Sequence, residues 1–230
     1  MLPGVAQLAL VEAALSLREG RAVRLAALRG VRFRRAVAPG QEPEVRLAAV
    51  GGDEVRFELR LGEERVSDGT ARIEEIGAAA AQGALDQGSA IGSSPEDFPA
   101  VDELVPHRPP ALFLRRLLAR DGGRLAAFAA VPRDSPFVRD DRAPALLTVE
   151  MAAQAAAALA ALGGPGGPPG LGYLVGVREA AFPQPWLAAE ALYAVTVHPA
   201  GGARALAVYD WRVEAGGVLH GAGTLSAFLT

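Results

Sequence analysis

The feature that most constrains the fold is one order of segments that occurs twice along the chain. A proline, an apolar helix-like segment and four strand-like runs with glycine-rich turns follow one another from Pro3, and again from Pro144. In each copy the proline marks the start of the helix and a later glycine marks its end. The pattern Leu-x-Gly-Val-Arg occurs at 28–32 and again at 174–178. Such a repeat predicts two related units instead of one continuous domain.

The runs after each helix have the lengths and turns of antiparallel strands. The runs lie at about 22–36, 43–50, 54–61 and 64–73 in the first copy, and at about 172–183, 190–199, 203–213 and 217–228 in the second. Short connections of this kind join antiparallel neighbours. Because both helices are apolar on nearly every face, we expect each to be buried against its own sheet. The pattern therefore predicts an α+β fold in which a sheet wraps around a helix twice.

The two copies differ in what precedes the helix. In the second copy two further strand-like runs, at 111–120 and 124–131, come before it, whereas the first copy begins at the helix itself. Residues 78–96 are small and polar without apolar periodicity, which is typical of a linker. We therefore predict an N-terminal half at 1–77 that lacks its first strands, a linker at 78–96, and a complete C-terminal half at 97–230.

Composition excludes several classes of function. The 230 residues include no cysteine and only three histidines, which are far apart in the sequence, so the chain predicts no disulfide, no thiolate nucleophile and no metal site. The net charge of −3 argues against a general nucleic-acid binder. The longest apolar stretch, 143–162, contains Glu150 and Gln154 and is better explained as a core helix than as a membrane span. We expect a cytoplasmic protein without a cofactor.

Five segments resemble the bacterial 3-hydroxyacyl-acyl-carrier-protein dehydratases, and most closely the paired dehydratase subunits of aryl-polyene pathways. Residues 104–123 contain the family's Pro-His-Arg opening, 143–156 are similar to its central helix with a Val-Glu-x-x-x-Gln sequence, and 172–178 resemble its third strand. In the first copy, 2–8 are similar to the helix start of the partner subunit, and 31–41 to an arginine-rich strand. The resemblance covers most of both halves, in the family's order.

The resemblance implies a double hot-dog fold, in which the two halves pair as the subunits of a dimer do. It also implies removal of water from a 3-hydroxyacyl thioester in fatty-acid or polyene synthesis. The implied partner is an acyl carrier protein, which holds the acyl chain on phosphopantetheine, and further hot-dog subunits are implied partners in an oligomer. Two alternatives stay open: a non-catalytic subunit that binds acyl thioesters, and a hot-dog thioesterase.

The elimination needs an acid–base pair, and the resemblance locates only part of one. Glu150 falls on the family's helix acid, six residues after Pro144, whereas Ala9 occupies the matching position after Pro3. The family's catalytic histidine lies in a Gly-His-Phe-Pro-Gly loop, which has no counterpart in the second half and in the first would fall before Met1. We therefore expect Glu150 to have no histidine partner about 3 Å away. His107 lies in a motif that the family uses structurally, and a substitute catalytic role is the alternative.

The remaining candidates are substrate-binding residues. We expect the backbone amides of Gly4 and Val5, at the start of the first helix, to point at the thioester oxygen across a cleft from Glu150. Gln154 is a further candidate. Arg34 and Arg35 are candidates for binding the acidic carrier protein near the mouth of a tunnel, and a plain solvated face is the other interpretation.

Three other titratable residues are expected to have ordinary structural places. Glu12 is interpreted as a residue on the solvent side of its helix. His198 and His220 lie in strand-like runs and are interpreted as ordinary sheet residues.

Overall fold

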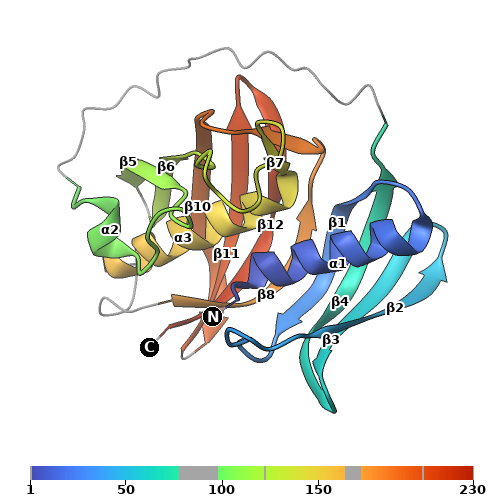
Figure 1. Ribbon diagram of the computed structural model, residues 1–230. Helices are drawn as coiled ribbons and strands as arrows, with labels where there is room; N and C mark the ends of the chain where they lie inside the picture. The colour runs from blue at the N-terminus through green and yellow to red at the C-terminus, as the bar shows by residue number, and fades with distance from the viewer. Residues whose placement is uncertain (1, 78–97, 122, 164–171, 204, 230) are drawn as a thin grey trace.

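In the described part of the chain, ten antiparallel strands form one main sheet that curves around two long helices (Figure 1). The computed structural model describes all residues except 1, 78–97, 122, 164–171, 204 and 230, so the predicted linker at 78–96 lies outside the described residues. The strand order is β2-β3-β4-β1-β8-β12-β11-β10-β6-β5. Both long helices, α1 and α3, lie on the same side of this sheet (Figure 1). This is the double hot-dog architecture that the sequence predicted.

The N-terminal half consists of one helix and four strands. Its helix follows Pro3 and ends before Gly20, as the sequence predicted. The elements are α1 (Gly4–Glu19), β1 (Val23–Phe33), β2 (Glu44–Gly51), β3 (Glu54–Leu61) and β4 (Glu64–Glu75).

The C-terminal half contributes six strands to the same sheet, so the expectation of fewer strands in the first half is confirmed for the described residues. A separate two-stranded ladder of β7 and β9 lies beside the start of α3. The elements are α2 (Val101–Leu104), β5 (Leu114–Asp121), β6 (Arg124–Ala129), β7 (Arg142–Pro144), the 3-10 turn η1 (Ala145–Leu147), α3 (Thr148–Ala161), β8 (Gly172–Ala181), β9 (Trp186–Ala188), β10 (Tyr193–Ala203), β11 (Leu206–Ala215) and β12 (Val218–Leu229).

The two halves join edge to edge through β1 and β8, and the repeated pentapeptide lies on both of these strands. Val31 is opposite Val177 in this antiparallel pair. A Cβ atom at Gly176 would lie 2.7 Å from the Val31 carbonyl oxygen, so a larger residue there would force the strands apart. Beyond the ladder, the Arg24 guanidinium from the N-terminal half donates to the Phe182 carbonyl oxygen at 2.6 Å. The junction is therefore held by backbone pairing and by one buried cation.

The two helices are not equally buried. Twelve of the fourteen residues of α3 are buried, but only six of the sixteen in α1. Leu17 of α1 is 85% exposed, because among the described residues the N-terminal half has no counterpart of α2, β5 and β6, which pack around α3. The expectation that each helix is buried against its own sheet thus holds for both, but α3 is enclosed on nearly every face, whereas much of α1 stays exposed. None of the described helices is both long and apolar enough to span a membrane.

Glu12 does not have the solvent-side place that the sequence suggested. Its carboxylate accepts a hydrogen bond from the Leu25 amide of β1 at 2.9 Å, and the side chain is only partly exposed. Burial is the main cause that raises the pKa of Glu12 from 4.5 to about 7, while the Leu25 amide and the nearby Arg24 charge act in the opposite direction. Burial therefore destabilises the charged carboxylate of Glu12 more than the hydrogen bond from Leu25 stabilises it.

The raised pKa of Glu12 predicts a loss of stability as the pH rises. The unfolded chain releases this proton near pH 4.5 and the folded chain near pH 7, so between these values the folded state binds more protons and the free energy of unfolding falls. Glu12→Gln removes this contribution, and we expect the variant to be more stable than the wild type at pH 8 by on the order of 2 kcal/mol. Urea denaturation from pH 4 to pH 8 measures the difference. Glu19→Gln, at the exposed end of the same helix, is the control, and a wild-type-to-Glu12→Gln difference that stays constant with pH would contradict the assignment.

Candidate active site

A cleft of about 550 Å³ lies where the two halves meet, and it contains most of the residues expected at the site. The start of α1 and the segment after β1 line it from the N-terminal half, and the loop after α2, with α3, β8 and β12, from the C-terminal half. The polar groups that line it come from Gly4 (through its backbone), Gln7, Arg34, Arg35, His107, Glu150 and Tyr173. Glu150 and the start of the first helix therefore share one cleft, as the sequence analysis expected.

Glu150 has a histidine partner. His107 Nε2 lies 3.1 Å from Glu150 Oε1, and their side chains are 28% and 8% exposed. The expectation that no histidine would lie near 3 Å from Glu150 is therefore wrong. The two residues come from the same half, so the pair does not depend on a loop that precedes the first helix. A carboxyl group and an imidazole at this distance can exchange a proton directly.

Local structure fixes both members of the pair. The η1 turn leads into α3, and Thr148 Oγ1 donates to the Ala145 carbonyl oxygen at 2.7 Å, which places Glu150 in the first turn of the helix. A carboxylate in this position interacts favourably with the helix dipole. His107 lies in the loop after α2, where Arg108 Nη1 donates to the carbonyl oxygens of Val105 and His107 at 3.0 and 2.8 Å.

Gln154 was predicted to bind substrate, but its side chain is completely buried and does not line the cleft. Its Nε2 donates to Glu150 Oε1 at 3.0 Å and to the Ala111 carbonyl oxygen at 2.8 Å. Its Oε1 accepts from the amides of Phe113 and Leu114 at 2.9 and 3.3 Å. Gln154 therefore links the carboxyl group to the strand that follows the His107 loop, and orients Glu150 without facing the cleft.

The start of α1 lines the cleft from the N-terminal half, and its first amides are candidate donors. The amides of Ala6 and Gln7 both donate to the Pro3 carbonyl oxygen, at 3.1 and 3.2 Å. The amides of Gly4 and Val5 precede them, and the first amides of a helix have no partner inside it. A Cβ atom at Gly4 would lie 3.0 Å from the Phe33 ring, so glycine lets this backbone approach β1 closely. The Val5 side chain is buried and does not line the cleft, which leaves only its amide as a candidate group.

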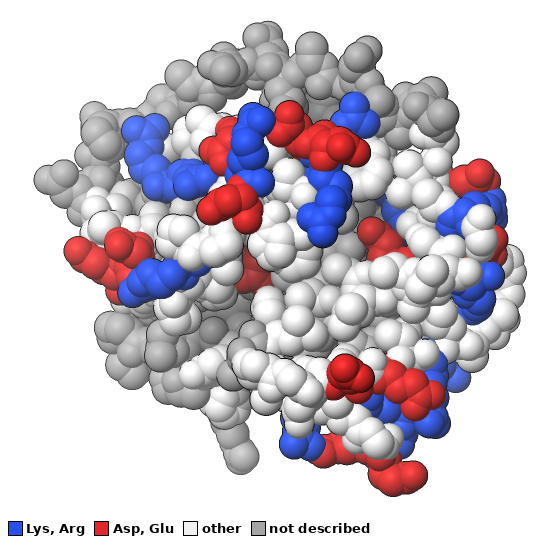
Figure 2. All heavy atoms as spheres, in the orientation of Figure 1, with Lys and Arg blue, Asp and Glu red and all other residues white. Residues whose placement is uncertain are grey.

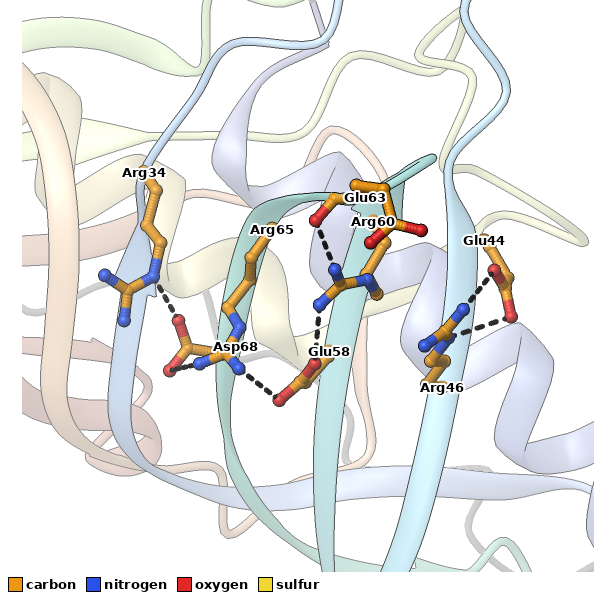
Figure 3. A network of polar contacts seen from close by, with 8 residues as sticks. All are labelled: Arg34, Glu44, Arg46, Glu58, Arg60, Glu63, Arg65 and Asp68. Carbon is orange, nitrogen blue, oxygen red and sulfur yellow. Dashed lines mark hydrogen bonds and ion pairs between the residues drawn. The ribbon is translucent and has the colours of Figure 1, made fainter.

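Arg34 and Arg35 line the cleft, and both are already engaged in ion pairs. Arg34 Nε donates to Asp68 Oδ1 at 2.6 Å, and Arg35 pairs with Glu64. Figure 3 shows that the Arg34 pair continues through Arg65, Glu58 and Arg60 across β4 and β3. Positive and negative side chains lie beside one another in the same way in the clusters visible in Figure 2.

The other histidines do not line the cleft. His198 is exposed in β10, 3.6 Å from Asp210. His220 is buried in β12 and packs edge-on against Tyr193, with the ring centroids 5.0 Å apart. Gln7 and Tyr173 are the polar residues of the cleft that the sequence analysis missed. The signal for Gln7 was an amide side chain near the start of a largely apolar helix.

Comparisons with known proteins agree with this architecture. A family model described as ApeP-like, ApeP dehydratase, matches residues 99–230. The dehydratase heterocomplex ApeI:P from Xenorhabdus doucetiae is similar over 58% of this chain and 92% of that chain, with a TM-score of 0.50 at 20% identity. No curated protein matches the chain.

Two further solved structures align over nearly the whole chain. The dehydratase domain from the CurJ module of curacin polyketide synthase aligns over 100% of this chain and 83% of that chain, with a TM-score of 0.69 at 13% identity. An acyl-CoA thioesterase II, TesB2 from Mycobacterium marinum, aligns over 98% and 87%, with a TM-score of 0.58 at 16% identity. At these identities the likeness establishes the fold, which dehydratases and thioesterases share.

The four hydrogen bonds of Gln154 predict a large loss of stability when its amide is removed. Gln154→Met keeps the length of the side chain but leaves the buried amides of Phe113 and Leu114 without their acceptor. We expect the free energy of unfolding to fall by about 2–4 kcal/mol, as measured by urea denaturation. The exposed Gln41→Met should change it by no more than about 0.5 kcal/mol. Equal effects of the two substitutions would show that the Gln154 bonds contribute little.

Proposed function

The chain belongs to the ApeP-like dehydratase family, and we propose that it removes water from a 3-hydroxyacyl thioester with His107 and Glu150 as its acid–base pair. The observation that carries this proposal is the 3.1 Å contact between His107 Nε2 and Glu150 Oε1 in the cleft between the halves. The volume of about 550 Å³ is within the usual range for small-molecule sites.

In the proposed reaction the two side chains have different roles. His107 Nε2 accepts the proton from C2, and the electron pair of that bond forms the C2–C3 double bond as the C3–O bond breaks. Glu150, protonated, donates its proton to the departing hydroxyl group, which leaves as water. Its Oε1 already contacts Gln154 and His107, so Oε2 is the oxygen that faces the substrate. His107 then releases the proton to solvent and Oε2 of Glu150 takes one up, which restores both groups.

The N-terminal half supports the reaction through its backbone. Negative charge develops on the thioester oxygen when the C2 proton leaves, and the amides of Gly4 and Val5 are the donors proposed to stabilise it. The positive end of the α1 dipole adds to their effect. Under this proposal the C-terminal half moves the protons, and the N-terminal half polarises the thioester.

One wall of the cleft suits an acyl chain. Ala153, Ala156 and Ala157 are spaced three and four residues apart on α3, so they lie on one face of the helix, and all three line the cleft. Leu225 and Ala227 of β12 line it from the sheet. Small apolar side chains leave room for methylene groups and bury them without a polar cost.

We also propose that an acyl carrier protein delivers the substrate, and that Arg34 and Arg35 contact it. Both arginines border the cleft, and their side chains are 40% and 44% exposed. Since each already has a carboxylate partner, the carrier protein would have to share the cation with Asp68 or Glu64. Under this proposal the acidic surface of the carrier protein contacts the N-terminal half. The pathway that we propose is fatty-acid or polyene synthesis. Other hot-dog subunits are further proposed partners.

The acid–base pair predicts a large loss of turnover in two variants. We expect Glu150→Gln and His107→Gln each to lower the rate of water elimination from a 3-hydroxyacyl pantetheine thioester by about 10²–10⁴-fold. The formation of the enoyl thioester, followed by absorbance and mass spectrometry, measures the rate. Glu179→Gln and His198→Gln change the same residue types on the exposed surface outside the cleft and are the matched controls.

The same assay separates the two alternative functions. Release of a free thiol and a carboxylic acid, lost in Glu150→Gln, would establish a thioesterase, which the shared fold with TesB2 makes the nearest alternative. Binding of the thioester without any turnover would establish a non-catalytic subunit, for which the alanine at position 9 is the supporting feature. Elimination that survives both cleft substitutions would contradict the proposed pair.

The carrier-protein contact predicts a salt-dependent loss of affinity. Arg34→Glu and Arg35→Glu each place a carboxylate beside another carboxylate at the mouth of the cleft, and we expect weaker binding of the carrier protein at low salt. The effect should shrink at high salt, because surface charges are screened over about 8–10 Å at physiological ionic strength. Arg46→Glu is the control, because it breaks an exposed ion pair with Glu44 that does not line the cleft. It should leave the affinity for the carrier protein unchanged. Unchanged affinity at both salt concentrations would refute the contact.

A further inference from the structure

Gln7 is a buried polar residue without a structural explanation. It lies in the first turns of α1, is 2% exposed and lines the cleft between the halves. Its Oε1 is buried, and no donor in the described part of the chain bonds it. A buried amide oxygen without a donor destabilises the folded protein, because it loses its hydrogen bonds to water. Beside the same cleft, the buried amide of Gln154 is fully bonded.

The position of Gln7 relates it to the proposed chemistry. Gln7 follows Gly4 by three residues, so both lie on one face of α1, about 4.5 Å apart along the helix axis. The Gly4 amide is the donor proposed for the thioester oxygen. In the substrate, the 3-hydroxyl group is bonded to C3, two carbon atoms from the thioester carbon C1. The distance from the thioester group to this hydroxyl group is similar to the distance from Gly4 to Gln7 along the helix. Glu150, on the opposite half, lines the same cleft.

We propose that Gln7 Oε1 accepts a hydrogen bond from the 3-hydroxyl group of the substrate and so positions it for protonation by Glu150; this inference rests on the dehydratase function proposed above. A hydroxyl group has one proton to donate and lone pairs to accept with. If Gln7 takes its proton, a lone pair is directed to the protonated carboxyl group of Glu150. The enoyl product has no hydroxyl group, so Gln7 distinguishes substrate from product.

Gln7→Met tests this assignment through binding. Pantetheine conjugates with an amide in place of the thioester do not undergo the elimination readily and resist thioesterase cleavage, and they can be made with and without the 3-hydroxyl group. We expect wild-type protein to bind the hydroxylated conjugate about 3- to 10-fold more tightly, the effect of one hydrogen bond. In Gln7→Met this preference should disappear, while the affinity for the conjugate without the hydroxyl group stays unchanged. Gln41→Met, the same change on the exposed surface, should keep the preference.

Stability provides a second, independent readout. A methionine at position 7 removes the unpartnered oxygen from the core, so we expect the melting temperature to be unchanged or to rise by about 2–4 °C. A residue with a purely structural role would show the opposite, a loss of stability with no change in hydroxyl preference.

The outcomes separate this inference from the function on which it rests. Binding of both conjugates by the wild type with equal affinity would overturn the role of Gln7 and leave the proposed dehydratase standing. A preference that persists in Gln7→Met would do the same. Failure of the wild type to bind either conjugate would overturn both proposals.

Discussion

The antiparallel pairing of β1 with β8 is the interaction on which the rest of the structure depends. It makes one continuous sheet from two halves and brings the start of α1 next to the start of α3. The register is specific, because a shift by one residue would move every side chain of β1 to the other face of the sheet. The close approach at Gly176 and the buried Arg24 cation hold this register. The cleft exists because the pairing leaves the two helix starts facing one another.

The two halves have diverged around this shared frame. The C-terminal half surrounds its helix with six strands of the main sheet and contains the His107–Glu150 pair. The N-terminal half has four strands, an alanine at position 9 and a helix whose Leu17 is exposed to solvent. What it contributes to the lining of the cleft is the start of α1, with Gly4 and the side chain of Gln7. Under the proposed function, the chemistry takes place in this one cleft, which residues of both halves line.

The polar groups around the cleft show two different ways of burying an amide. Gln154 has a partner for each of its polar atoms and holds Glu150 in a fixed orientation. Gln7 has an oxygen without a donor among the described residues, and such a group is stable only if the surrounding structure outweighs its cost. Positioning groups of the first kind add stability, whereas groups that await a ligand reduce it. This contrast separates the two glutamines, which look alike in the sequence.

The sequence by itself determined the repeat, the order of the two long helices and of the strands of the main sheet, the unequal strand content of the two halves and the place of Glu150 on a core helix. These follow from apolar periodicity and from proline and glycine at helix ends, which act within a few residues of the chain. Only the tertiary structure decided that His107 lies against Glu150, although 43 residues separate them in the sequence, and that Gln154 points away from the cleft while Gln7 points into it. The path of the loop after α2 brings that histidine back to α3, and packing between the two halves determines which face of α1 meets the cleft. Neither depends on local periodicity, because both are set by contacts between segments that are distant in the chain.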